Sequence, residues 1–270
     1  MQANESKQIT SSANPKIKLL VKMRKKPSRD DTGLILIDGI REIRKALENN
    51  IRIEEVYYCK DLLKDSKLLE VVSLKNCSLF EVSISVFSKI AFGDRREGIV
   101  ALAQRPKINL EQLKVNKDSI FVVVENIEKP GNLGAIIRTC DAAGISALIV
   151  CDNKTDIYNP NVIRGSLGGC FCLPLVECLK QEAIRWLKSQ HINIMCATPG
   201  AKTNYWQANL NFPCAVVLGS EDKGVSDDFK TASDFRVSIP MKGKIDSLNV
   251  SASAAIILYE ILRRKTLKPI

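Results

Sequence analysis

The chain has 270 residues, and its 45% hydrophobic and 26% charged content excludes a disordered chain and suffices for one large domain or two modest ones. Lys and Arg number 40 against 30 Asp and Glu, so the net charge of +10 fits a polyanionic partner such as nucleic acid, although a basic surface also serves solubility. One His and nine Cys, none of them in a Cys-x-x-Cys pair, exclude a histidine-based triad and a typical zinc site.

We predict a basic α/β domain over residues 1–107. These residues carry 21 basic and 14 acidic groups (+7), against 19 and 16 (+3) in the rest of the chain. A short helix with a basic face is predicted in the lead-in 1–30, where a frayed, solvated terminus is the alternative. Apolar runs predict strands at 34–37, 55–59, 78–82 and 98–103, with a helix at 40–47 and another between the second and third strands. The polar segment 108–118 is the predicted linker to a second domain.

Residues 119–270 alternate more regularly between strand and helix patterns. Strands are predicted at 120–124, 147–151, 171–176, 192–197, 215–218 and 235–239. Helices are predicted at 134–143, 162–167, 181–188, 227–231 and 250–264. Apolar strands that alternate with helices indicate a mostly parallel sheet covered on both faces, which binds ligands at the carboxyl ends of its strands. Cys170 and Cys172, which are two residues apart, would share one face of a strand.

Three polar, glycine-containing segments each follow an apolar run of this second domain. They are Asn132-Leu133-Gly134 through Arg138-Thr139, Gly219-Ser220-Glu221 through Gly224 and Ser226, and Ile239-Pro240-Met241 through Ser247-Leu248-Asn249. No G-x-G-x-x-G or G-K-[ST] sequence accompanies them, which excludes the usual dinucleotide and P-loop sites. Because loops at one sheet edge converge, we expect a single pocket. Taken singly, Asn132 and Asn249 also suit helix N-caps, Glu221 a solvated turn and Arg138 an ordinary helix surface.

In this order the three segments resemble the three motifs of the SpoU (TrmH-type) RNA ribose 2′-O-methyltransferases, over about residues 118–265. The run Asn159-Pro160-x3-Arg164-Gly165-Ser166 resembles a further family segment, in which Ala is common at the position of Gly165. Asn14-Pro15-x-Ile17-Lys18 and Leu36-Ile37-Asp38-Gly39-x-Arg41-Glu42 are similar to the family's substrate-binding domain, itself similar to small ribosomal RNA-binding proteins. Asp38 and Asp246 stand where family members commonly have Glu.

The resemblance implies a trefoil-knotted parallel-sheet methyltransferase domain over 119–270, preceded by a small α/β RNA-binding domain. It also implies a homodimer, S-adenosylmethionine as methyl donor and structured RNA, above all ribosomal RNA, as substrate. The residues it assigns to the cofactor are Thr198, Leu218, Gly219, Ile239, Met241 and Leu248. The residues it assigns to catalysis are Arg138, Asn132, Glu221, Ser247 and Asn249.

Arg138 is the residue that the resemblance brings nearest to the ribose hydroxyl. A guanidinium is essentially always protonated, so holding a phosphate and stabilising the forming alkoxide suits it better than acting as a general base. By the same resemblance Asn132 orients Arg138 or the ribose, and Glu221 supports Arg138 or its own loop. Ser247 and Asn249 would donate or accept hydrogen bonds at the ribose, the phosphate or the cofactor.

Eight basic residues of the first domain are candidates for phosphate contacts. They are Lys16, Lys18, Arg24, Lys25, Lys26, Arg41, Arg95 and Arg96. As a group they would form one face for structured RNA, and for any one of them an ordinary solvated surface is the alternative.

Other functions stay open on the sequence alone. One is a transfer-RNA 2′-O-methyltransferase, although family members acting on transfer RNA often lack a full-length N-terminal domain. Another is a non-catalytic RNA-binding or ribosome-assembly protein on the same fold, and a third is a small-molecule α/β enzyme with an incidental basic surface. Housekeeping and drug-resistance roles are not separable.

The cysteines lie mostly in apolar runs, and neither a signal peptide nor an apolar run near 18 residues is found, so we expect a cytoplasmic protein with free thiols.

Overall fold

The computed structural model describes residues 7–74, 77–92, 97–152 and 154–266. The chain divides into two compact units. The first comprises Met1–Pro106 with Tyr158–Cys172, and the second comprises Lys107–Ile157 with Leu173–Ile270. The chain therefore passes from one unit to the other at 106/107, at 157/158 and again at 172/173.

The first unit contains a five-stranded sheet in the order β1-β4-β3-β5-β2. Its strands are β1 (Lys7–Ile9), β2 (Leu34–Asp38), β3 (Ile53–Tyr58), β4 (Ser78–Val82) and β5 (Ile99–Gln104). β4 pairs in parallel with β1 and β3, whereas β5 is antiparallel to β2 and β3. Its helices are α1 (Pro15–Lys22), α2 (Lys26–Thr32), α3 (Ile40–Glu48), α4 (Lys67–Ser73) and α5 (Ile84–Ile90), joined by α7 (Pro160–Gly165) and the 3-10 helix η2 (Gly169–Phe171).

The predicted basic helix near the N-terminus is α1, and its sequence explains both its start and its buried face. The side chain of Asn14 accepts a hydrogen bond from the Lys16 amide at 2.9 Å, and Pro15 supplies a backbone angle suited to the first helical position. Ile17 and Leu20 are buried in a core cluster that also contains Met23, Phe80 and Phe87. Burial of this stripe leaves the lysines of α1 on the outer side of the helix.

The second unit contains a seven-stranded sheet in the order β10-β12-β9-β11-β6-β7-β8, and all of its strand pairs are parallel. The strands are β6 (Ile120–Glu125), β7 (Ala147–Cys151), β8 (Leu175–Cys178), β9 (Asn193–Ala197), β10 (Thr203–Asn204), β11 (Cys214–Leu218) and β12 (Phe235–Ser238). The helices are η1 (Leu110–Gln112), α6 (Pro130–Ala142), α8 (Lys180–Ser189), α9 (Asp227–Ala232) and α10 (Val250–Thr266). The predicted parallel α/β sheet is confirmed.

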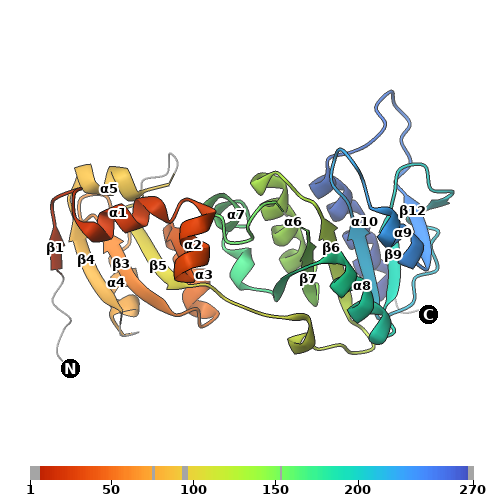
Figure 1. The fold of residues 1–270 in the computed structure, drawn as a ribbon, viewed down its shortest axis with the longest axis horizontal. Coiled ribbons are helices and arrows are strands. Elements are labelled where there is room, and N and C mark those ends of the chain that lie inside the picture. Colours follow the sequence, from red (N-terminus) through yellow and green to blue (C-terminus); the bar gives the residue numbers. More distant parts are fainter. Residues whose placement is uncertain (1–6, 75–76, 93–96, 153, 267–270) are drawn as a thin grey trace. The chain divides into compact units, whose positions relative to one another are not determined.

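Helices cover both faces of this sheet (Figure 1). On one face Phe121, Val123 and Ile149 pack with Trp186 of α8 and Phe229 of α9 in one buried cluster. Against the other face α10 packs beside α6. Full burial explains why the central strands are apolar at every position rather than at alternate ones.

Two expectations about local structure were wrong. The strand predicted at 171–176 begins only at Leu175, because positive φ angles at Leu167 (56°) and Gly168 (81°) turn the chain into η2 first. Cys170 and Cys172 therefore do not share a strand face; Cys170 is buried and Cys172 half-buried. The helix α5, whose first turn is capped by the Ser83 hydroxyl, was not predicted. None of the helices described here is long and apolar enough to cross a membrane.

Candidate active site

The carboxyl ends of four neighbouring parallel strands gather the predicted site. β12, β9, β11 and β6 follow one another in the second sheet, so the loops that leave them lie at one edge. Thr198 directly follows β9, and Leu218 ends β11 and leads into Gly219. Ile239 to Met241 follow β12, and the loop after β6 leads to α6. This edge is where open α/β sheets bind their ligands.

One polar side chain from each of the three motifs meets here, in what we call the Asn132–Glu221–Asn249 cluster. The Asn132 amide group donates to the Glu221 carboxylate. The amide of Asn249 donates to Asn132 Oδ1 at 3.1 Å. Asn249 Oδ1 in turn accepts from the amide of Ser251 at 2.9 Å and from its hydroxyl at 2.6 Å, which fixes it at the start of α10. Three of the five predicted catalytic residues are thus in direct contact although they lie far apart in the sequence.

The other two predicted catalytic residues lie outside this cluster. Arg138 is exposed on α6 and forms no hydrogen bond or ion pair with any residue that the structure describes. Ser247 is exposed in the loop between β12 and α10. The carboxylate of Glu221 therefore supports Asn132 rather than Arg138, and the Arg138 guanidinium is left available to a ligand.

The second motif is a tight turn that requires glycine at its first position. The Gly224 amide donates to the Ser220 carbonyl at 2.9 Å, and Gly224 itself has a φ of 64°. A Cβ atom on Gly219 would lie only 1.9 Å from the carbonyl carbon of Gly224 and 2.2 Å from the amide nitrogen of Val225. This close backbone approach excludes any side chain at 219 and places Glu221 at the exposed tip of the turn.

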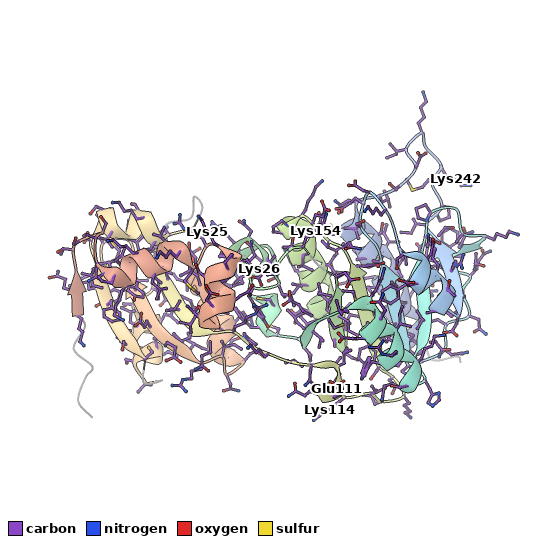
Figure 2. The ribbon with its side chains drawn as sticks, viewed as in Figure 1. Lys25, Lys26, Glu111, Lys114, Lys154 and Lys242 are labelled. Carbon is purple, nitrogen blue, oxygen red and sulfur yellow. The ribbon has the colours of Figure 1, made fainter. Side chains whose placement is uncertain are left out.

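The third motif is a loop without helix or strand between β12 and α10, on which Lys242 lies (Figure 2). The backbone amides of residues 241–248 donate no hydrogen bond to any described residue. Ile239, Met241 and Leu248 are half-buried, so apolar surface lies beside polar backbone groups that the fold leaves unused. This combination suits a cofactor with an aromatic base, because backbone groups can bind its edge while apolar side chains cover its faces.

The remaining expected cofactor residues contribute mainly through their positions. Leu218 is buried, and Gly219 and Thr198 are half-buried. The Thr198 amide already donates to the Val237 carbonyl at 2.9 Å, which joins the end of β9 to β12. The part of the chain that the structure describes holds no cluster of His, Cys, Asp or Glu suited to a metal ion.

Four of the predicted RNA-binding residues present free charges on the first unit. Lys18, Lys25, Lys26 and Arg41 are exposed and form no ion pair with any described residue. Lys25 and Lys26 lie where α1 gives way to α2 (Figure 2). These four side chains can contact phosphate without first breaking an internal interaction.

Two others are engaged within the unit. Lys16 pairs with Glu55 and lies 4.8 Å from the centre of the Phe80 ring. The Arg24 guanidinium donates to the carbonyls of Lys89 at 2.7 Å and Ala91 at 2.5 Å. Both side chains therefore have a structural role in this unit. Arg95 and Arg96 lie outside the described residues.

Two acidic residues near the site, Glu128 and Glu125, were not identified from the sequence. Lys154 donates a hydrogen bond of 2.5 Å to Glu128 on the second unit, and this bond is the main cause that lowers the pKa of this carboxyl, with smaller contributions from the charges of Lys223 and Lys129. Glu125, the last residue of β6, is a buried carboxylate beside the second motif. An acidic residue that ends an otherwise apolar strand was the one available sequence signal for it.

Comparison with known proteins identifies the family of the chain. Residues 119–259 match the model of the SpoU rRNA Methylase family, and residues 14–101 match that of the MRM3-like substrate binding domain. A 23S rRNA (guanosine-2′-O-)-methyltransferase of Pasteurella multocida is 31% identical over 241 residues, which are 85% of this chain and 98% of that protein.

Two solved structures cover nearly the whole chain. The crystal structure of an RNA 2′-O ribose methyltransferase is 39% identical, with a TM-score of 0.84 over 96% of this chain and 100% of its own. The S-adenosylmethionine-bound rRNA methyltransferase of Sinorhizobium meliloti is 25% identical, with a TM-score of 0.89 over 97% of this chain and 99% of its own. With its family-model match spanning more than half of its length, this chain belongs to the SpoU rRNA methylase family.

Proposed function

We propose that this chain transfers a methyl group from S-adenosylmethionine to the 2′-hydroxyl of a ribose in ribosomal RNA, in particular that of the large subunit. The observation that carries this proposal is the Asn132–Glu221–Asn249 cluster, in which the three family motifs meet at the ligand-binding edge of the sheet. Related proteins named as 23S rRNA 2′-O-methyltransferases, and a relative solved with S-adenosylmethionine bound, support the substrate and the cofactor.

The cofactor is assigned to the loops after β9, β11 and β12. Thr198, Leu218, Gly219, Ile239, Met241 and Leu248 would hold it. The half-buried side chains of Ile239, Met241 and Leu248 would cover its apolar parts, and the unused amides of the third motif would bind its polar edges. When bound, the cofactor supplies an activated methyl group on a positively charged sulfur.

The residues of this chain would position the ribose and stabilise the negative charge of its phosphate and of the forming alkoxide. The hydroxyl must align with the bond that breaks, and such positioning contributes much of the rate in this type of reaction. Arg138, exposed and without an internal partner, is suited to hold the adjacent phosphate and to stabilise the forming alkoxide. Asn132 and Asn249 are held by Glu221 and by each other, so their remaining hydrogen-bonding capacity has a fixed direction. Ser247 is free to bind the ribose or the phosphate.

The two sequence domains are proposed to divide the work. Residues 1–107 would bind RNA through Lys18, Lys25, Lys26 and Arg41, with contributions from Lys16, Arg24, Arg95 and Arg96. Residues 108–118 would link them to the catalytic residues 119–270. The match of residues 14–101 to a substrate-binding domain supports this division.

Three further properties are part of the proposal. The packing of α10 on α6, after the chain has passed through the β12–α10 loop, is compatible with a trefoil knot. A homodimer is proposed from the family resemblance, and α10, on which Tyr259 is 50% exposed, is the first surface to test for it. All nine cysteines are free, which suits the reducing cytoplasm.

The test is transfer of labelled methyl from S-adenosylmethionine to RNA taken from cells that lack this protein, so that the target is unmodified. Free RNA and ribosomal particles are assayed with the wild type, with Arg138→Ala and with Arg185→Ala, an exposed arginine of α8 that serves as the matched control. We expect label in large-subunit rRNA, resistant to alkaline cleavage at one position, with the wild type and the control only.

Other outcomes identify the alternatives. Label in transfer RNA would make the chain a transfer-RNA methyltransferase. No label on either substrate, together with no heat of binding for S-adenosylmethionine, would leave an RNA-binding or ribosome-assembly protein on the same fold.

A further inference from the structure

A buried carboxylate outside the three motifs joins the first motif to the second. Glu125 ends β6 and is 1% exposed. Its Oε2 accepts a hydrogen bond from the Ser226 amide at 2.9 Å, and Ser226 is both the last residue of the second motif and the residue before α9. Directly after Glu125, Asn126 has a φ of 56° and turns the chain out of the sheet toward α6. Glu125 thus lies where the segment carrying Asn132 begins and where the segment carrying Glu221 ends.

The surroundings of Glu125 offer little other reason for its presence. Its second oxygen, Oε1, has no hydrogen bond to a described residue, and the ammonium of Lys180 lies 3.7 Å away. Lys180 is closer to Asp228, at 2.9 Å. Burying a carboxylate costs several kcal/mol unless it is well paired, so this arrangement is poor as a stabilising ion pair. Among the residues that the structure describes, its one well-formed hydrogen bond is that from the Ser226 amide.

Together with the Asn132–Glu221 contact, this bond closes a ring. The ring runs from Glu125 along the chain to Asn132, across to Glu221, along the second motif to Ser226 and back to Glu125. Only two links in it are non-covalent. If the link at Glu125 is lost, the turn that carries Glu221 keeps its strand attachment at Leu218 and the buried Val225 beside Ser226, but it loses the hydrogen bond that ties its last residue to β6.

We infer that Glu125 is a positioning residue for methyl transfer, which holds Glu221 against Asn132 through the Ser226 amide. It touches neither substrate nor cofactor and acts on the reaction only through the Asn132–Glu221–Asn249 cluster. The inference rests on the proposed function for its kinetic readout but not for its structural one.

The experiment compares the single variants Glu125→Ala, Glu125→Gln and Glu221→Ala in the full-length protein. A double variant combines Glu125→Ala with Glu221→Ala. Glu125→Gln keeps an oxygen that accepts from the Ser226 amide. Asp227→Asn is the matched control, because this exposed neighbour of Ser226 pairs with Lys230, at 3.0 Å, and with no other residue that the structure describes. The measurements are kcat for methyl transfer, the Kd of S-adenosylmethionine by calorimetry and hydrogen exchange of residues 219–226.

We expect Glu125→Ala to lower kcat by about 10- to 100-fold, the usual effect of a displacement near 1 Å in a catalytic group. The Kd of S-adenosylmethionine should change less than about threefold, and exchange over residues 219–226 should accelerate. Glu125→Gln and Asp227→Asn should behave like the wild type. Because Glu125 acts on the reaction through Glu221, Glu125→Ala should not lower kcat any further in a protein that already carries Glu221→Ala.

Three results would overturn the inference: full kcat in Glu125→Ala, equal losses in Glu125→Ala and Glu125→Gln, or losses that multiply in the double variant. If Glu125→Ala does not accumulate in folded form, Glu125→Asp makes the same comparison, since it withdraws the carboxylate by one methylene. If the wild type itself transfers no methyl group, the proposed function fails. Faster exchange of residues 219–226 in Glu125→Ala would then still support the positioning role, and unchanged exchange would refute it.

Discussion

Asp38 offers a direct test of the electrostatics of the first unit. It ends β2, is half-buried, and accepts a hydrogen bond from the Phe92 amide. Burial is the main cause that raises the pKa of this carboxyl from 3.8 to about 6; the Phe92 hydrogen bond and the charge of Arg164 lower it, and Glu97 and Glu42 raise it. The folded protein therefore holds a proton here between pH 4 and pH 6 more tightly than the unfolded chain does.

The sign and the size of the effect follow from this difference. Since the pKa of an acid is higher in the folded state, stability is gained as the pH falls through 6 and is lost as the pH rises again. A separation of about two pH units corresponds to about 3 kcal/mol of destabilisation when the carboxylate is fully ionised. At pH 4.5 about 1 kcal/mol of this destabilisation remains. The contribution of Asp38 to the free energy of unfolding therefore changes by about 2 kcal/mol between pH 7.5 and pH 4.5.

Asp38→Asn removes this titration and keeps an oxygen that can accept from the Phe92 amide. We expect Asp38→Asn to be more stable than the wild type at pH 7.5, by up to about 3 kcal/mol, and the gap to narrow by about 2 kcal/mol at pH 4.5. Both tryptophans, Trp186 and Trp206, lie in the second unit, so their fluorescence does not report on the first. Hydrogen exchange of the β2 and β5 amides, corrected for intrinsic rates, measures the stability of the first unit instead.

The control is Asp31→Asn, which removes an exposed carboxylate of α2 in the same unit. It should reproduce the pH dependence of the wild type. A stability gap between Asp38→Asn and the wild type that stays constant from pH 7.5 to pH 4.5 would refute the reasoning, since it would mean that burial does not shift the titration of Asp38.

Three more variants test the second unit and the RNA-binding surface. Gly219→Ala, whose Cβ would meet Gly224 at 1.9 Å, should destabilise the second unit by more than about 2 kcal/mol in urea unfolding and should abolish methyl transfer. Phe229→Ala, which empties a fully buried site, should cost about 3–5 kcal/mol by the same measurement. Lys25→Glu combined with Lys26→Glu should weaken RNA binding and flatten its salt dependence by about one unit of slope per lysine.

Each of these predictions has a result that contradicts it. Gly219→Ala with wild-type stability would mean that the second motif is not closed as described. A loss below about 1 kcal/mol in Phe229→Ala would mean that α9 is not firmly packed. An unchanged salt slope in the double lysine variant would remove the α1–α2 turn from the RNA-binding surface.

Strands were the part of the fold that the sequence predicted best. The limits of β4 and β7 are those predicted. In β7 a continuous apolar run flanked by polar residues leaves few other structures open, whereas β4 mixes apolar residues with Ser78 and Glu81. The apolar run at 170–173 led to a strand being predicted too early in the chain. The path of this run depends on the positive φ angles at Leu167 and Gly168, which composition does not reveal. The packing of residues 158–172 with the first unit has no local signal either, because it depends on contacts with α3 and β2.

The site was predictable as a set of motifs but not as a network. The order of the three motifs pointed to their convergence, yet which side chains meet depends on distances that no sequence spacing fixes. Glu221 accepts a hydrogen bond from Asn132, and Arg138 forms no hydrogen bond or ion pair with either of these described residues. Burial was equally hidden: Arg24 and Lys25 are neighbours in a basic run, but Arg24 binds two carbonyls and Lys25 faces solvent.

The repeated passage of the chain between the two units limits how the protein can be taken apart. A single cut in the linker leaves the halves covalently joined through 157/158 and 172/173. A fragment ending at Pro106 lacks α7 and η2, so it loses the Arg164 bond to the Phe92 carbonyl and the segment that packs on β2 and α3. A fragment beginning at Lys107 carries the same segment, in which the buried Val162 and Ile163 lie on the helix that packs on β2. We therefore expect neither fragment to fold as it does in the full chain, and we expect a truncation or domain exchange to require residues 158–172 together with the N-terminal unit.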